Sequence, residues 1–208
     1  MRTLSTRRVK PAILADAVAT VVQRGGTVIF PTDTVYGIGC DPYRREAVAR
    51  IFALKGRPTG KPLTLHFSRV EELLEYAPGN ELAAALAHAF LPGPLTIVVR
   101  RLSFVGEWVA GGLSTIGLRV PQHALCATIL ERCGPLAATS ANYSGAPAFT
   151  GSGTALDLPA ADLRVDDGPT VLQVESTVVD ASQNVLRLVR EGAISVTMLE
   201  HALGNVAR

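Results

Sequence analysis

Polar side chains suited to binding an anion gather in two short stretches of the chain. The first, residues 31–37, reads Pro-Thr-Asp-Thr-Val-Tyr-Gly and follows the apolar run Thr27–Phe30, which is typical of a buried strand. The second, residues 55–63, brings three cations within seven positions and contains two prolines. Because prolines restrict the backbone, ordering this loop around a ligand costs less entropy. Hydroxyl groups at a strand end and a stiffened basic loop together predict an anion-binding pocket.

The basic loop does not match a common phosphate-binding motif. The spacing from Gly56 to Lys61 is one residue short of a Walker A loop, and Pro62 stands where that motif has Ser or Thr. The chain also has no G-x-G-x-x-G fingerprint. A solvated basic loop is therefore the alternative to a binding loop, and the flanking prolines favour the binding loop.

Arg119 lies within an apolar segment, residues 116–120, which reads as a strand. A buried arginine needs an anionic partner, because an unpaired charge is costly away from water. That partner is either an acidic side chain, in a structural ion pair, or a carboxylate or phosphate of a substrate held by both nitrogens of the guanidinium.

Four further polar positions are ambiguous when taken singly. Thr139–Asn142 follows a buried strand, where small polar groups suit ligand contacts and turns equally. Glu175–Thr177 interrupts two apolar strands, so a β-bulge is its alternative. Arg190 follows the expected strand 185–189, where a surface arginine is the default. His66 lies in a short strand without metal-ligand spacing to the other histidines, which favours a structural histidine over a ligand.

The sequence predicts no protein-bound metal site and no covalent nucleophile. It contains no H-E-x-x-H motif, no paired cysteines and no G-x-S-x-G elbow. Cations and hydroxyls at loop positions remain. They indicate catalysis by positioning and charge stabilisation, as in phosphoryl or nucleotidyl transfer.

Composition limits the class of protein. The 208 residues suffice for one large domain or two small ones, and 48% apolar against 18% charged residues argue against disorder. The net charge of +2 means that any phosphate or nucleic-acid binding must come from local clusters of Lys and Arg. Three cysteines without C-x-x-C spacing indicate reduced thiols in a cytoplasmic protein. No apolar run approaches the roughly 20 residues of a membrane span.

Apolar periodicity predicts interleaved helices and strands that position these side chains. Helices are expected at residues 11–24, between Pro42 and Lys55, at 70–76, 81–90 and 124–130, and from 196 onward. Strands are expected at residues 27–30, 63–67, 95–100, 115–120, 136–138, 163–165, 170–174, 177–180 and 185–189. The order is not strictly strand–helix–strand, so the prediction is an α/β fold with a mixed sheet.

Taken together, the motifs resemble the YrdC-like family of L-threonylcarbamoyladenylate synthases. The matching segments occur in family order from about residue 10 to residue 200. They are Pro31–Gly37, Lys55–Pro58, Lys61–Leu63, Pro92–Thr96, Gly117–Pro121, Thr139–Asn142 with Ser144-Gly145, Glu175–Thr177 and Arg190–Gly192. The resemblance implies an α/β domain with a large twisted mixed sheet and flanking helices around a concave basic cavity. It also implies a single domain over residues 1–208, of the short form without an additional C-terminal domain.

The resemblance implies that the enzyme is a nucleotidyltransferase, with ATP as substrate and Mg²⁺ accompanying it. L-threonine, bicarbonate and ATP would give threonylcarbamoyl-AMP and pyrophosphate. The product would supply the threonylcarbamoyladenosine modification of tRNA through a separate transferase complex in the cytoplasm. Weak binding of tRNA to this chain itself is left open.

The resemblance also implies roles for individual residues. Lys61 and Arg57 fall at the catalytic positions that offset charge on the phosphates. The ATP-side positions are Lys55, Arg57, Lys61, Thr115, Ser140, Asn142 and Arg190. The threonine-side positions are Thr34, His66, Arg119, Thr139 and Ser176. Arg119 would pair with the carboxylate of the amino acid.

Two other functions remain as alternatives. One is a non-catalytic RNA-binding module, against which the four tyrosines and one tryptophan offer few stacking surfaces. The other is carbamoyl transfer to a different acceptor. Pyrophosphate release that depends on threonine would separate the synthase from both.

Overall fold

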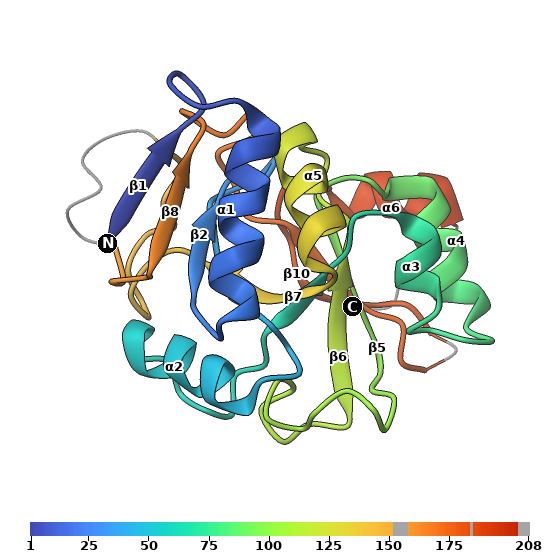
Figure 1. The fold of residues 1–208 in the computed structure, drawn as a ribbon. Coiled ribbons are helices and arrows are strands. Elements are labelled where there is room, and N and C mark those ends of the chain that lie inside the picture. Colours follow the sequence, from blue (N-terminus) through green and yellow to red (C-terminus); the bar gives the residue numbers. More distant parts are fainter. Residues whose placement is uncertain (152–157, 184, 204–208) are drawn as a thin grey trace.

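A computed structural model describes residues 1–151, 158–183 and 185–203. Within these residues ten strands form one sheet, in the order β1-β8-β2-β3-β7-β4-β6-β5-β9-β10 (Figure 1). The sheet is mixed, since β2 pairs parallel with β8 and antiparallel with β3. The predicted α/β fold with a large mixed sheet and flanking helices is therefore confirmed.

The strands of the described chain are β1 (Arg2–Ser5), β2 (Val28–Phe30), β3 (Gly37–Cys40), β4 (Thr64–His66), β5 (Leu95–Arg100), β6 (Thr115–Arg119), β7 (Leu136–Ser140), β8 (Leu163–Asp166), β9 (Thr177–Asp180) and β10 (Arg187–Arg190). Its helices are α1 (Pro11–Gln23), α2 (Arg45–Lys55), α3 (Val70–Leu74), α4 (Glu81–Phe90), α5 (Ala124–Cys133) and α6 (Val196–Leu203).

Alternation along the strands gives the sheet a hydrophobic core on each face. Val28 and Phe30 of β2 pack with the buried faces of α1 and α5, which lie side by side in Figure 1. Ile29, which points the other way, belongs to the larger core that includes α2, α3, α4 and α6. Residues two apart in a strand therefore belong to the same core.

The sheet face that carries α1 and α5 is apolar beneath these helices and polar farther along the sheet. Beneath these helices the strands β8, β2 and β7 contribute apolar side chains. Farther along, the same face of β4, β6 and β5 carries Thr64, His66, Gly117, Arg119 and Thr96, while the intervening residues point into the larger core. This polar half of one sheet face is where the candidate site lies.

One predicted strand is wrong. Residues 170–174 form bends instead of a strand, and Val171 is 82% exposed. The segment is held by two contacts with the Pro31–Gly37 stretch: the Thr170 hydroxyl donates to the Thr34 carbonyl (2.7 Å), and the Leu172 amide donates to the Asp33 carbonyl (3.0 Å). Gln173 adopts a positive φ of 54°, which a strand does not allow. Apolar composition alone therefore misled the strand prediction.

Two strands were not predicted. β1 pairs parallel with β8, from Arg2 opposite Leu163 to Ser5 opposite Asp166. β3 contains Gly37 and Gly39, whose absent side chains make room for the ring of Phe30; a Cβ on Gly39 would lie 2.9 Å from that ring. Glycine weakens a strand signal in sequence, but here it permits close packing.

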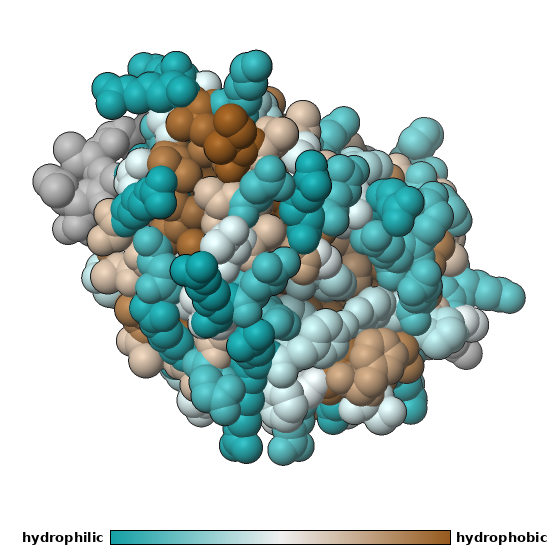
Figure 2. Space-filling view, viewed as in Figure 1, coloured by the Kyte–Doolittle hydropathy of each residue, from teal (hydrophilic) through white to brown (hydrophobic). Residues whose placement is uncertain are grey.

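No helix among the described residues is long and apolar enough to cross a membrane. Figure 2 shows one face of the molecule, on which hydrophilic side chains predominate around two separate brown, apolar areas, one at the upper left and one at the lower right.

Candidate functional site

The polar half of the sheet face forms the floor of a cavity of about 350 Å³. Ala138, Thr64, Gly117 and Val98 are successive register partners across β7, β4, β6 and β5, and all four line this cavity. A Cβ on Gly117 would approach both Thr64 and Thr96 at 3.1 Å. The glycine therefore keeps the floor open at its centre.

The cavity brings together nine of the twelve residues singled out from the sequence. They come from loops and strands that are far apart in the chain: Thr34, Arg57, Lys61, His66, Arg119, Thr139, Ser140, Ser176 and Arg190. Their convergence follows from strand order, because β3 and β7 pair with Gly37 opposite Ser140, which places the two hydroxyl-rich stretches at the same edge of the floor.

The basic loop is held at the cavity by its own backbone. Helix α2 ends at Gly56, which adopts the left-handed conformation (φ 59°) that commonly terminates a helix. The Arg57 guanidinium then donates to the carbonyls of Lys61 (3.2 Å) and Pro62 (2.9 Å). Burial lowers the pKa of Arg57. The loop is thus closed on itself, with its cations at the cavity.

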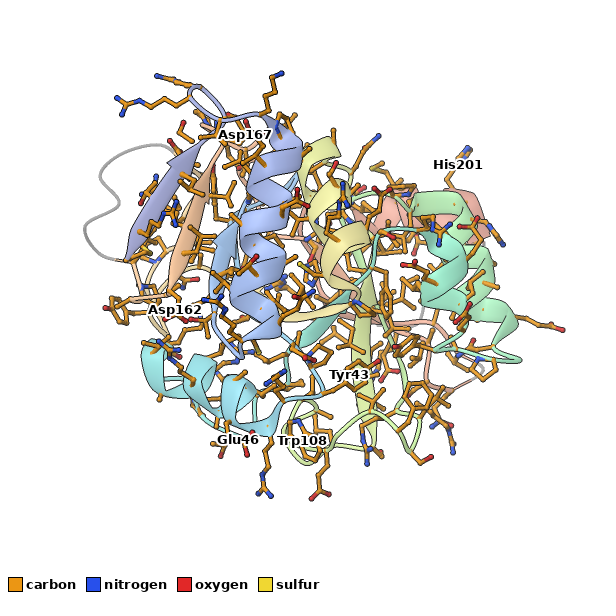
Figure 3. All side chains as sticks on the ribbon, in the orientation of Figure 1. Tyr43, Glu46, Trp108, Asp162, Asp167 and His201 are labelled. Atoms are coloured by element: carbon orange, nitrogen blue, oxygen red, sulfur yellow. The ribbon has the colours of Figure 1, made fainter. Side chains whose placement is uncertain are left out.

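A second loop, residues 101–114, supports the basic loop from outside. Gly111 lies so close that a Cβ there would be 2.8 Å from the Thr59 carbonyl oxygen. The Leu63 amide donates to Val109 (2.9 Å), and the Trp108 indole donates to the Pro42 carbonyl (3.2 Å). Trp108 lies beside the start of α2, near Glu46 (Figure 3). The supporting loop is therefore anchored to both ends of the α2 region.

Arg119 has an acidic side chain as its partner and also faces the cavity, where it could bind an anionic substrate. Its guanidinium donates to Asp33 (2.5 Å) and to the Gly93 carbonyl (3.2 Å), and Arg119 and Asp33 are each 4% exposed. Arg119 also lines the cavity, so the ion pair does not remove it from the site. The second carboxylate oxygen of Asp33 is buried and has no hydrogen-bond partner among the described residues. Asp33 belongs to the motif but was not predicted to have a role.

His66 is held as a neutral ring. Burial and the adjacent Arg119 charge lower its pKa to about 3. Its Nδ1 lies 3.3 Å from the Thr64 carbonyl oxygen. The tautomer that lets Nδ1 donate there leaves Nε2 as a hydrogen-bond acceptor. A neutral imidazole at this position can accept a hydrogen bond, but it is a weak base near neutral pH.

Hydroxyls and one ion pair line the remaining wall. The Ser176 hydroxyl lies 2.9 Å from that of Thr96, and both are buried. Arg190 donates to the Ser176 carbonyl (2.8 Å) and to the Glu175 carboxylate (2.8 Å). Thr96 and Glu175 also line the cavity but were not predicted as site residues. Thr96 alternates with apolar residues in β5, which is the signal that could have placed it on the polar face.

Three predicted residues are not among those that line the cavity. Lys55 is buried at the end of α2, where its ammonium group donates to the carbonyls of Ser140 and Asn142. The Asn142 amide donates to Tyr143 (2.9 Å) and Ala146 (2.6 Å). Thr115 starts β6 opposite Arg100, at the other end of the strand from Arg119.

The cavity suits an anionic, polar ligand. Four of its lining side chains are the cations Arg57, Lys61, Arg119 and Arg190, and Glu175 is its carboxylate. Across the described residues, no group of three or more His, Cys, Asp or Glu side chains could hold a metal ion. The arrangement can bind phosphates and a carboxylate, orient them and offset developing charge.

Comparison with known proteins agrees with this geometry. Residues 20–192 match the Sua5/YciO/YrdC family model, described as telomere recombination. The chain is 37% identical over 191 residues to a threonylcarbamoyl-AMP synthase of Pyrococcus abyssi, covering 89% of this chain and 56% of that protein. It is 35% identical over 204 residues to a putative threonylcarbamoyl-AMP synthase of Mycobacterium leprae, covering 93% and 89%.

The chain is also similar in fold to a solved structure. The fold matches the crystal structure of P. abyssi Sua5 complexed with L-threonine, with a TM-score of 0.90 and 34% identity over 99% of this chain and 61% of that one. The chain thus spans little more than half the length of the P. abyssi relative it matches.

Proposed function

The chain belongs to the Sua5/YciO/YrdC family, and from that premise we propose that it is a threonylcarbamoyl-AMP synthase. In this reaction L-threonine, bicarbonate and ATP give threonylcarbamoyl-AMP, pyrophosphate and water. The observation that carries the proposal is the convergence of nine motif residues on one cavity.

L-threonine binds at the end of the cavity formed by Arg119 and His66. The Arg119 guanidinium pairs with the threonine carboxylate, while Asp33 keeps the guanidinium oriented and partly neutralised. The neutral His66 offers Nε2 to an N–H or O–H of threonine. The hydroxyls of Thr34, Thr139 and Ser176 line the same cavity and recognise the polar groups of the amino acid.

ATP binds with its phosphates against the basic loop. Arg57 and Lys61 offset the phosphate charge, and Ser140 and Arg190 contact the nucleotide. Asn142 and Thr115, which are not among the residues that line the cavity, stay in the proposal as ATP-side residues. Mg²⁺ enters with ATP, where it offsets phosphate charge. One lining carboxylate, Glu175, fits a metal held mainly by phosphate oxygens and water.

The chemistry requires no protein nucleophile. The threonine amine attacks the carbon of carbon dioxide formed from bicarbonate, which gives an N-carboxylate and releases a proton. A carboxylate oxygen then attacks the α-phosphorus of ATP, and the bond to the β-phosphate oxygen breaks to release pyrophosphate. Arg57 and Lys61 stabilise the charge that develops on the leaving group.

The proposal extends to the setting of the enzyme. Residues 1–208 act as one domain in the cytoplasm, and the product passes to a separate transferase complex that modifies tRNA. These statements rest on the family relationship and on the chemistry of the product, which is an activated threonylcarbamoyl group.

The test is pyrophosphate release from ATP and Mg²⁺, with L-threonine and bicarbonate each present or omitted. Release that requires both substrates supports the synthase. Release without threonine indicates carbamoyl or nucleotidyl transfer to another acceptor. No release from folded protein that nevertheless binds RNA in a salt-dependent manner would favour an RNA-binding module.

A further inference from the structure

Lys55 contacts the turn after β7 through both its side chain and its backbone. Its ammonium group donates to the carbonyls of Ser140 and Asn142, and its own carbonyl accepts from the Ser144 amide (2.9 Å). The side chain is 2% exposed. One residue therefore joins the end of α2 to residues 140–144.

The contacts that shape the basic loop after Lys55 do not include its ammonium group. The Arg57 amide donates to the Phe52 carbonyl (2.9 Å), and its guanidinium donates to Pro62 (2.9 Å). Gly111 supports the loop on its outer side. These contacts involve neither the Lys55 ammonium nor the turn after β7, so the two walls of the cavity are held by separate sets of bonds.

The turn after β7, in contrast, is bound directly by the Lys55 ammonium group. Buried carbonyl oxygens require hydrogen-bond donors. The Asn142 carbonyl accepts from the ammonium group, and the Ser140 carbonyl accepts from it and from the Asn142 amide (3.0 Å). Burial lowers the pKa of Lys55 to about 8, so the cation is kept there at an energetic cost. Ser140, the last residue of β7, lines the cavity, and its carbonyl is one of the two that the Lys55 ammonium binds.

We propose that Lys55 is a positioning residue, which holds the Ser140–Asn142 turn against the end of α2 and does not contact the phosphates of ATP. The inference rests on the proposed function and revises the sequence-based assignment of Lys55 as an ATP ligand. It divides the two lysines of the motif: Lys61 binds phosphate, and Lys55 shapes the wall that receives the rest of the nucleotide.

The experiment compares Lys55→Met with Lys61→Met by isothermal titration with MgATP, magnesium pyrophosphate and L-threonine. Methionine keeps the length of the side chain but removes the donors. Lys55→Met should weaken ATP binding about tenfold, because the released turn must then be ordered when the nucleotide binds. It should leave pyrophosphate and threonine affinity unchanged. Lys61→Met should weaken ATP and pyrophosphate binding together.

Equal losses of ATP and pyrophosphate affinity in Lys55→Met would overturn the inference while leaving the proposed function intact. Unchanged ATP affinity in Lys55→Met would overturn it too. Wild-type protein that binds neither ATP nor pyrophosphate would overturn the proposed function and the inference with it.

A second measurement uses the wild-type protein, in case Lys55→Met does not fold. In a ¹⁵N-labelled sample at pH 6.5, the Lys55 ammonium should give a slowly exchanging ¹H–¹⁵N signal without ligand, because the group is buried and hydrogen-bonded. Addition of pyrophosphate should add no scalar coupling to ³¹P. A signal that appears only with pyrophosphate, or that gains such a coupling, would show a direct phosphate contact and overturn the inference.

Discussion

At the scale of single residues, the site depends on buried charges whose partners lie far away in the sequence. Arg119 pairs with Asp33, 86 positions earlier, and the pair places one guanidinium at the cavity wall. The same positive charge acts on His66 and contributes to lowering its pKa. A cation and a neutral imidazole therefore stand side by side, which suits a ligand that offers both a carboxylate and hydrogen-bond donors.

Arg119→Met should abolish measurable threonine binding and leave ATP binding intact. The single change also leaves Asp33 as a buried, unpaired carboxylate, which costs roughly 3–5 kcal/mol of stability. The double variant Arg119→Met/Asp33→Asn should recover part of that stability without recovering threonine affinity. Urea unfolding and calorimetric titration measure the two effects separately. Threonine affinity retained in either variant would contradict the assignment.

His66 should make the fold sensitive to acid. Its pKa is about 3 in the folded protein and about 6.5 in the unfolded chain, so the unfolded state binds more protons between these values. Stability conferred by neutral His66 is complete above pH 6.5 and is lost as pH falls towards 3. Between pH 7.5 and pH 5, wild type should lose about 2 kcal/mol relative to His66→Asn.

The check on His66 is urea unfolding of both proteins across that pH range. The same substitution at the exposed His88 is the matched control. A constant difference in unfolding free energy between wild type and His66→Asn would show that His66 is not held neutral.

At the scale of elements, the basic loop is shaped by its neighbours. The left-handed Gly56 terminates α2, Arg57 closes the loop on Pro62, and the loop at residues 101–114 packs against it at Gly111. Trp108 fixes that supporting loop to Pro42. Phosphate affinity should therefore respond to changes outside the loop.

Gly111→Ala and Gly112→Ala form a matched pair that tests this support. Both glycines have positive φ, 62° and 80°, so an alanine at either position costs roughly 1–2 kcal/mol in backbone strain. Only at Gly111 would the added Cβ collide, at 2.8 Å from the Thr59 carbonyl oxygen; Gly112 has open space. Gly111→Ala should weaken pyrophosphate binding beyond Gly112→Ala in calorimetric titration. Equal affinities in the two variants would show that the contact does not shape the loop.

At the scale of the whole molecule, the cavity is assembled from residues between Thr32 and Arg190 on one continuous sheet. Ligand binding should therefore stabilise the domain as a unit. At ATP concentrations of about 100 times Kd, the free energy of unfolding should rise by about 2.7 kcal/mol.

Amide hydrogen exchange checks how far this stabilisation spreads. Amides in the middle of α1 and α5 belong to the core beside the cavity, and no residue of α1 or α5 is among those that line it. If they exchange through global unfolding, ATP should slow them by the same factor as amides of β4 and β6. Slowing confined to the basic loop would indicate that the domain does not unfold as one unit.

Local pattern was sufficient for much of the fold. The bounds of β5, β9 and α4 were predicted to the residue, because each combines a strong apolar period with clear flanking signals. Apolar periodicity gave a wrong strand prediction at residues 170–174. Apolar side chains there are exposed, and hydrogen bonds to the carbonyls of Asp33 and Thr34 set the path of the chain. The same periodicity missed β3, where glycines create space for Phe30. Both exceptions depend on neighbours that lie elsewhere in the chain.

The sequence by itself determined the kinds of side chain at the site, since motif residues in the right order identify a hydroxyl-rich, cationic cavity. Only the tertiary structure decided which of those side chains face it. Lys55 and Arg57 are two positions apart, yet one faces the carbonyls of the turn after β7 and the other lines the cavity. The direction of a buried polar group is set by the donors and acceptors around it, and strand order, rather than local sequence, brings those partners together.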